Sequence, residues 1–296
     1  MEQFIVAMPG NEELAQGLAW ALELPQAALA FRRFPDGEAY LRLDAPVQGA
    51  GVILVATLSQ PDERIPPLLF AADLARDLGA ARIGLVAPYL CYMRQDQRFQ
   101  PGEALTSKSF ARWISAHFDW LVTVDPHLHR YHSLDEIYAL QSSVVTAAPA
   151  IADWIEAHVE RPVLIGPDSE STQWIRAVAK PRALPWRVFE KQRHGDREVS
   201  MRLPDLEPIK GHQPVLVDDI ISSGTTVAQA TRHLREAGLA APLVIGVHGL
   251  HDEQARQTLA EAGIARLICT NTVTTRESEI DLSALLLPAI RRLAGG

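Results

Sequence analysis

Short apolar runs alternate with amphipathic stretches along almost the whole chain, and this alternation limits the possible folds more than any other feature. The runs with the length and composition of buried strands are Gly51–Ala56, Ile83–Ala87, Trp120–Val124, Pro162–Ile165, Val215–Val217 and Leu243–Val247. The stretches with helical periodicity between them are Leu68–Leu78, Ser109–Ala116, Ala147–His158 and Thr226–Ala237. Continuously apolar strands joined through helices predict an α/β fold, with a mostly parallel sheet covered by helices on both faces.

The length of 296 residues favours two domains of about 150 residues each. A weak internal repeat agrees with this division. Arg76–Gly79 leads into one predicted strand, and the similar Arg235–Gly238 leads into another. We therefore expect two similar α/β domains, residues 1–147 and 148–296.

The stretch from Val215 to Thr226 carries the strongest chemical signal. An apolar strand is followed by two acids, Asp218 and Asp219, and then by a loop of small and hydroxyl residues that enters a predicted helix. The free N–H groups and positive dipole at a helix start attract phosphate, to which the loop hydroxyls add donors. The acids repel phosphate but suit sugar hydroxyls or a metal, so the stretch fits ribose 5-phosphate. The alternative is a turn capped by Asp-Asp and a flexible connection.

Four further motifs precede this loop. They are Phe34–Glu38 (Phe-Pro-Asp-Gly-Glu), Arg94–Arg98 (Arg-Gln-Asp-Gln-Arg), Thr123–His129 with the sequence Asp125-Pro126-His127, and Gly166–Asp168. Each alone has an ordinary interpretation, since Pro-Asp-Gly is common in plain turns, arginine-rich patches are usually solvated, and a histidine after a strand is more often structural. Several nevertheless lie at the carboxyl ends of predicted strands, and parallel sheets bind their ligands at these ends.

In this order, the motifs and the Asp218–Thr226 loop resemble the ribose-phosphate diphosphokinases, the phosphoribosyl-pyrophosphate synthetases. The resemblance extends from Phe34 to Thr226. In Arg94–Lys108 and Asp218–Thr226 the amino-acid sequence is closer to that of the shorter archaeal-like members. The resemblance implies two phosphoribosyltransferase-like domains, and a reaction in which ATP and ribose 5-phosphate give AMP and phosphoribosyl pyrophosphate. Two alternatives stay open: a phosphoribosyltransferase that consumes phosphoribosyl pyrophosphate, and a non-catalytic regulatory homologue.

The resemblance also implies a role for each motif. The ATP-binding residues would be Phe34, Asp36, Glu38, Arg94, Gln95, Asp96 and His127, the first three reaching across from a neighbouring subunit of a homo-oligomer. Ribose 5-phosphate would contact Asp218, Asp219, Ser222, Ser223, Gly224, Thr225 and Thr226. The metal would be Mg²⁺, near His127 and Asp168, and oxygen preference favours Asp168 as the direct ligand. Lys191 and Arg193, in the polar segment Glu190–Asp196, match a mobile catalytic loop.

The chain departs from the commonest members at two places. Ser169–Trp174 replaces a glycine-containing stretch and adds Glu170, which could serve a metal or, as we favour, complement the start of a helix. Phe99–Ala104 lacks the basic character of a region that forms a phosphate/ADP regulatory site in typical bacterial members. This region therefore gives no support for allosteric activation by phosphate, and the sequence leaves the regulation of the enzyme open.

The composition limits the binding partners and the cellular compartment that can be expected. The net charge of −8 disfavours binding to nucleic acid or to an anionic membrane. No apolar run reaches the roughly 18 residues of a membrane span, and no signal peptide is recognisable. Cys91 and Cys269 form no metal or disulfide pattern. We expect a cytoplasmic enzyme.

Overall fold

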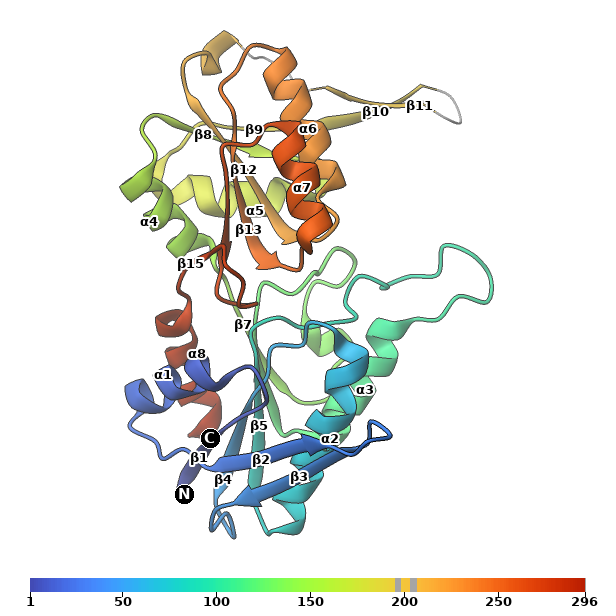
Figure 1. The fold of residues 1–296 in the computed structure, drawn as a ribbon, viewed down its shortest axis with the longest axis vertical. Helices are drawn as coiled ribbons and strands as arrows, with labels where there is room; N and C mark the ends of the chain where they lie inside the picture. Colours follow the sequence, from blue (N-terminus) through green and yellow to red (C-terminus); the bar gives the residue numbers. More distant parts are fainter. Residues whose placement is uncertain (195–197, 203–206, 296) are drawn as a thin grey trace. The chain divides into compact units, whose positions relative to one another are not determined.

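The computed structural model describes residues 1–194, 198–202 and 207–295, and for 190–194 and 198–202 the backbone alone. The chain divides into two compact units, one made of Met1–Val145 with Ser283–Gly296 and the other of Thr146–Leu282. Figure 1 draws both units, each an α/β layer structure. The predicted fold class, with parallel sheets between helices, is confirmed.

The first unit is built on a five-stranded parallel sheet with the strand order β1-β4-β5-β6-β7. Its strands are β1 (Gln3–Ala7), β4 (Gly51–Val55), β5 (Arg82–Ala87), β6 (Trp120–Val124) and β7 (Gln141–Val145). An antiparallel ribbon, β2 (Ala28–Arg33) and β3 (Ala39–Asp44), stands apart from this sheet. The helices are α1 (Glu12–Leu22), α2 (Pro61–Asp77), α3 (Thr106–His117) and the distant α8 (Ser283–Ala294), with the short 3-10 helix η1 (Leu134–Glu136).

The sheet of the first unit is covered on both faces. Helices α2 and α3 pack together on one face, while α1 and α8 cover the other (Figure 1). The central strands are apolar throughout, and Ile53, Leu54, Leu85 and Leu121 are at most 2% exposed. Burial of such strands between two helical layers supplies the main hydrophobic stabilisation of the unit.

The second unit contains a six-stranded sheet with the strand order β15-β14-β13-β12-β8-β9. Its strands are β8 (Pro162–Gly166), β9 (Trp186–Val188), β12 (Gln213–Ile221), β13 (Leu243–Gly249), β14 (Arg266–Thr270) and β15 (Ser278–Ile280). A separate antiparallel ribbon is formed by β10 (Glu190–His194) and β11 (Glu198–Arg202). The helices are α4 (Ala148–His158), α5 (Thr172–Ala179), α6 (Thr225–Glu236) and α7 (Glu253–Ala262), with 3-10 helices η2 (Ser169–Ser171), η3 (Lys180–Arg182) and η4 (Glu207–Ile209).

The two units repeat one plan. In the first, β1 and α1 lead to the β2–β3 ribbon and then to β4, α2, β5, α3 and β6. In the second, β8 and α5 lead through β9 to the β10–β11 ribbon and then to β12, α6, β13, α7 and β14. Strand β4 is the sheet neighbour of β1 just as β12 is the sheet neighbour of β8. The weak repeat seen in the sequence is thus a repeat of topology.

The last helix lies in the first unit, although the expected boundary after residue 147 assigned everything from 148 onward to the second. Helix α8 packs on α1, β6 and β7. Arg292 also donates a 2.7 Å hydrogen bond to the Ser143 hydroxyl of β7. Helix α4 follows β7 in the chain but packs on α5 and β15 in the second unit. Each unit therefore completes its helical layer with a helix that follows the last strand of the other.

The segment from Glu190 to Asp196 was expected to be a loop, and for Glu190–His194 this expectation is wrong. These residues form β10, paired with β11 in the register Lys191↔Met201 and Arg193↔Val199. Residues 195 and 196 lie outside the described part of the chain. Among the helices that the structure describes, none combines the length and hydrophobicity needed to cross a membrane.

Candidate active site

The centre of the candidate site is the end of β12 with the loop that follows it. Asp218 and Asp219 lie inside β12, and Ser222 to Gly224 form the turn into α6. Gly224 is the N-cap residue with a φ of 71°, a left-handed conformation that favours glycine. Because no side chain caps α6 at this residue, backbone N–H groups of its first turn remain available to an anion.

The loop hydroxyls gather at the same turn. The Ser223 and Thr225 hydroxyl oxygens lie 3.1 Å apart, and both residues are exposed. Ser222 and Thr226 are half-buried beside them. Several hydroxyl donors and a helix start thus occupy one short turn, which is the arrangement predicted for a phosphate group.

Asp218 and Asp219 provide the acidic wall. Asp219 is buried and Asp218 half-buried. Removal from water raises the pKa of Asp218 well above its ordinary value, and the negative charges of Asp219, Asp168 and Glu170 raise it further. The backbone N–H of Asp219 donates a 3.1 Å hydrogen bond to Asp218 Oδ1 and opposes this shift. The site therefore concentrates negative charge that a cation or hydroxyl groups would relieve.

Asp168 and Glu170 reach this acidic group from the end of β8. Asp168 is the N-cap of η2, and its Oδ1 accepts a 3.1 Å hydrogen bond from the N–H of Glu170. Glu170 lies in the first turn of η2, as favoured from the sequence, but its charge also acts on Asp218. Both roles considered for Glu170 therefore keep support.

The Phe34–Glu38 motif forms the turn between β2 and β3 in the first unit. The N–H of Phe34 donates to the carbonyl of Glu38 at 2.8 Å, and Asp36 Oδ1 accepts from the N–H of Glu38 at 3.2 Å. The Phe34 ring is 39% exposed, and the Arg32 guanidinium lies 4.3 Å from its centroid. An exposed aromatic ring with two acids at the end of a ribbon is well placed to contact another molecule.

The Arg94–Asp96 motif divides into an exposed part and a buried part. Arg94 is exposed, while Gln95 Oε1 accepts a 3.0 Å hydrogen bond from the Thr106 hydroxyl. The side chain of Asp96 is 1% exposed and accepts a 2.8 Å hydrogen bond from Arg130. The carboxylate of Asp96 thus holds the Arg130 guanidinium in place.

His127 follows β6 and lies against a second histidine. Its Nδ1 is 3.2 Å from Nε2 of His129, and the two rings meet edge to face. The preceding Asp125 is buried and has a φ of 34°, unusual for a residue other than glycine. The sequence motif Thr123–His129 included His129 without a role, and Arg130 was missed, although the His-x-His-Arg spacing after a predicted strand was visible.

The structure thus brings Asp168, Glu170, Asp218 and Asp219 together in the second unit. In the first unit, Gln95 and Asp96 contact different partners, Thr106 and Arg130. The structure places Lys191 and Arg193 in β10. A parallel sheet in which a strand ends in paired acids, followed by a hydroxyl-rich turn into a helix, defines a protein of the phosphoribosyltransferase type.

Comparison with known proteins agrees and is more specific. Residues 3–117 match the family model for the N-terminal domain of ribose phosphate pyrophosphokinase, and residues 133–284 match the phosphoribosyl transferase domain. The ribose-phosphate pyrophosphokinase of Methanothermobacter thermautotrophicus is 32% identical over 97% of this chain and 99% of the relative. The ribose-phosphate pyrophosphokinase of Saccharolobus solfataricus is 32% identical over 93% of this chain and 95% of the relative.

A solved structure extends the likeness to three dimensions. The phosphoribosylpyrophosphate synthetase of Mycobacterium smegmatis is 25% identical, with a TM-score of 0.86 and 99% of each chain covered. The chain belongs to the ribose-phosphate pyrophosphokinase family. The resemblance to this family, including its archaeal members, is confirmed, as are the two phosphoribosyltransferase-type domains.

Proposed function

We propose that this chain transfers the diphosphoryl group of ATP to the anomeric hydroxyl of ribose 5-phosphate, giving phosphoribosyl pyrophosphate and AMP. The observation that carries the proposal is the pairing of Asp218 and Asp219 with the Ser222–Thr226 turn, in a chain similar over its full length to ribose-phosphate pyrophosphokinases. Its two buried, unbridged cysteines suit a cytoplasmic setting.

The second unit would hold the sugar phosphate. The N–H groups at the start of α6 and the hydroxyls of Ser222, Ser223, Thr225 and Thr226 would bind the 5-phosphate. Asp218 and Asp219 would accept hydrogen bonds from the ribose hydroxyls, because ionised carboxylates are acceptors only.

Mg²⁺ suits the donors present. Asp168, Asp218, Asp219 and Glu170 supply carboxylate oxygens, and the raised pKa of Asp218 marks a place where positive charge is needed. Asp168 is the residue of this group that we assign to the metal, with His127 near the phosphates or a metal-bound water. When bound, Mg²⁺ neutralises phosphate charge.

The nucleotide would be held by Arg94, Gln95 and His127, with Asp96 acting through Arg130. Phe34, Asp36 and Glu38 would contact the adenine from a neighbouring subunit, so the active form is at least a dimer. The anomeric oxygen forms a bond to the β-phosphorus, the bond from that phosphorus to the α,β-bridging oxygen breaks, and AMP leaves as the hydroxyl proton is released. Lys191 and Arg193 on the β10–β11 ribbon would stabilise charge on the transferred group.

An assay of AMP release tests the proposal. With ATP, Mg²⁺ and ribose 5-phosphate, the protein should form AMP and phosphoribosyl pyrophosphate in equal amounts. AMP release must depend on ribose 5-phosphate. Consumption of phosphoribosyl pyrophosphate with a nucleobase, without use of ATP, would instead identify a phosphoribosyltransferase. Binding without turnover would identify a non-catalytic homologue.

A further inference from the structure

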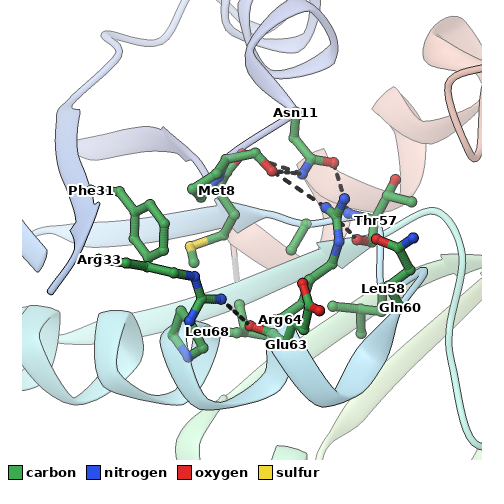
Figure 2. Close-up of a pocket in the computed structure, with 13 residues that line it drawn as sticks. Met8, Asn11, Phe31, Arg33, Thr57, Leu58, Gln60, Glu63, Arg64 and Leu68 are labelled. Carbon is green, nitrogen blue, oxygen red and sulfur yellow. Dashed lines mark hydrogen bonds between the residues drawn. The ribbon is translucent and has the colours of Figure 1, made fainter. Parts of the chain in front are cut away.

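The first unit contains a cavity that the proposed reaction does not use. It lies at the carboxyl ends of β1 and β4, and Figure 2 shows its lining. Met8 and Asn11 come from the loop after β1, Thr57 and Leu58 from the loop after β4, and Phe31 and Arg33 from β2. The first turns of α2 close it with Glu63, Arg64, Pro67 and Leu68. Its volume is about 170 Å³.

The position of this cavity repeats the position of the ribose-phosphate loop in the second unit. There, the candidate residues follow β8 and β12, next in sequence to the β10–β11 ribbon and to α6. Here, the lining follows β1 and β4 and includes the β2–β3 ribbon and α2, the topological counterparts. Ligands of open α/β sheets bind at this edge of the sheet. The repeated plan therefore leaves a ligand-binding position in the first unit as well.

The chemistry of the cavity differs from that of its counterpart. Ala56 and Thr57 follow β4, whereas paired acids lie near the end of β12, so the carboxylates that would hold sugar hydroxyls are absent from the described loop after β4. Arginines are present instead, and Met8, Phe31, Leu58 and Leu68 add an apolar wall. An anion with an apolar body fits this lining better than a sugar does.

Arg64 is the residue best placed to bind an anion. It is half-buried, and its Nη1 donates to the carbonyls of Pro9 and Thr57 at 3.4 Å each. These two bonds hold the guanidinium at the cavity, and within the part of the chain that the structure describes its other N–H groups donate no further hydrogen bond. A guanidinium has five N–H donors in a planar fork that matches a carboxylate or phosphate.

Asn11 and Arg33 fix the rest of the frame. Asn11 is 4% exposed, its Nδ2 donates to the carbonyl of Met8 at 3.2 Å, and its Oδ1 accepts from the N–H of Thr57 at 2.7 Å. Arg33 Nη2 donates to the carbonyl of Glu63 at 3.1 Å and links the ribbon to α2. Figure 2 shows these bonds on opposite sides of the cavity. The lining is thus ordered before any ligand binds, which lowers the entropic cost of binding.

From this geometry we propose that the first unit holds a second ligand site, for a small organic anion with one carboxylate or phosphate group on an apolar body. The anionic group contacts Arg64, and the apolar body lies against Met8, Phe31 and Leu68. A cavity of about 150 Å³ holds a benzene-sized molecule, so the body is a single ring or a short branched chain. A whole nucleotide is too large.

Methyl NMR tests this proposal without reference to turnover. The chain has four methionines, and of these Met8 lines the cavity. In protein labelled at the methionine methyl carbons, benzoate and phenyl phosphate are the probes, and inorganic phosphate is the probe without an apolar body. At least one organic probe should shift the Met8 signal saturably, and more tightly than inorganic phosphate does. The Met93 signal, from a buried residue outside the cavity lining, is the internal control.

Two substitutions with opposite expected effects on the binding of the organic probes extend the test. Arg64→Leu should weaken binding at least tenfold, because a charge-assisted hydrogen bond is lost. Glu63→Gln should strengthen it about twofold or more, because an exposed negative charge beside the anion is removed. An unchanged Met93 signal shows that each variant is folded. The proposal is overturned if neither organic probe moves the Met8 signal up to about 10 mM. It is also overturned if inorganic phosphate binds as tightly as both organic probes, or if folded Arg64→Leu binds like wild type.

Discussion

The backbone N–H of Asp219 donates a hydrogen bond to the carboxylate of Asp218, the residue before it, across 3.1 Å. This bond favours the ionised form of Asp218, but burial and the charges of Asp219, Asp168 and Glu170 outweigh it and raise the pKa. The ligand-free protein therefore carries an electrostatic penalty at the place where the substrate should bind. Carboxylates proposed to bind the substrate thus reduce the stability of the ligand-free protein.

Asp218→Asn should stabilise the ligand-free protein while reducing its use of ribose 5-phosphate. A carboxyl whose folded pKa is raised destabilises the fold above that pKa, and the penalty vanishes below the unfolded value of 3.8. We expect the free energy of unfolding to rise by about 1 kcal/mol or more at pH 7, with a smaller rise toward pH 4. The kcat/KM for ribose 5-phosphate should fall at least tenfold.

Urea unfolding at the two pH values and steady-state kinetics measure these effects. Asp44→Asn is the control, because the Asp44 side chain is 79% exposed and its replacement should change stability by no more than about 0.5 kcal/mol. A variant less stable than wild type at pH 7 would contradict the electrostatic account of this site.

Lys191→Ala should lower the turnover number by about 10²–10³ at saturating substrates if, as proposed, Lys191 stabilises the charge that develops on the transferred group. Arg193→Ala should act in the same direction, and the double variant should lose less than the product of the two effects. Lys210→Ala, at a lysine 61% exposed, is the control and should keep the wild-type rate. If chemistry limits the rate and Lys191→Ala stays within about threefold of wild type, the β10–β11 ribbon has no part in the mechanism.

Asp36→Ala and Lys191→Ala should complement each other when the two variants are co-expressed. If the Phe34–Glu38 turn serves the site of another subunit, a mixed pair has one site with both residues intact. Random pairing then restores up to about one quarter of wild-type turnover. Turnover of the unseparated co-expressed protein, compared with each variant alone, measures this. If co-expression gives no more activity than the better single variant, the turn does not contribute to a site shared between subunits. Full activity in a strict monomer would lead to the same conclusion.

Gly224→Ala should reduce both stability and ribose 5-phosphate binding. Gly224 has a φ of +71°, and an added Cβ would lie 3.0 Å from Cγ of Leu259. The matched control is Gly238→Ala, where φ is +79° and no atom lies within 4 Å of the added Cβ. Both variants should lose about 1 kcal/mol from backbone strain, and Gly224→Ala should lose more. Thermal unfolding and the KM for ribose 5-phosphate measure the difference, and equal losses with an unchanged KM would contradict the proposed close packing at the phosphate turn.

Glu277→Gln should destabilise the second unit in a pH-dependent way. Burial raises the pKa of Glu277, but hydrogen bonds from Arg256, His251 and Arg276 outweigh it and lower the value from 4.5 to about 2. A depressed folded pKa stabilises the fold above the unfolded value, and the benefit is lost as the pH falls toward 2. We expect the variant to lower the free energy of unfolding by about 2–3 kcal/mol at pH 7, and by less in acid.

Denaturant unfolding between neutral pH and pH 3 checks the trend for Glu277. Glu207→Gln, at a side chain 80% exposed, is the control, with an expected change within about 0.5–1 kcal/mol. A cost that stays constant with pH would show that packing, and not charge, sets the contribution of Glu277.

The sequence predicted those elements whose residues share one environment along their length. Trp120–Val124 is buried throughout and agrees with β6 residue for residue. Val215–Val217 marks only part of β12, which continues to Ile221, because Asp218 and Asp219 interrupt the apolar run. Helix α2 begins at Pro61, well before the predicted Leu68, because Pro66 and Pro67 hide its start. The β10 strand gave no signal because its residues are polar and show no apolar alternation.

The candidate site was predictable where neighbours in sequence act together. The Asp218–Thr226 loop is one continuous segment, so its arrangement as strand, turn and helix followed from its pattern. The hydrogen bond of Arg130 to Asp96 joins residues 34 positions apart, and no local pattern reveals it. The cavity beside Arg64 is still less visible, because three separate segments and a ribbon create it.

The exchange of α4 and α8 between the two units has a consequence for synthesis on the ribosome. A growing chain releases β1 to β7 long before α8, which together with α1 covers one face of that sheet. At about 5–20 residues per second, the part of that apolar face that α8 covers stays exposed for many seconds. The Gln3 side chain donates a hydrogen bond to the carbonyl of Ala294, so residues 291 positions apart in the sequence meet in one unit. Nascent chains should therefore depend on chaperones until α8 emerges from the ribosome, whereas the second unit can assemble while α8 is still inside the exit tunnel.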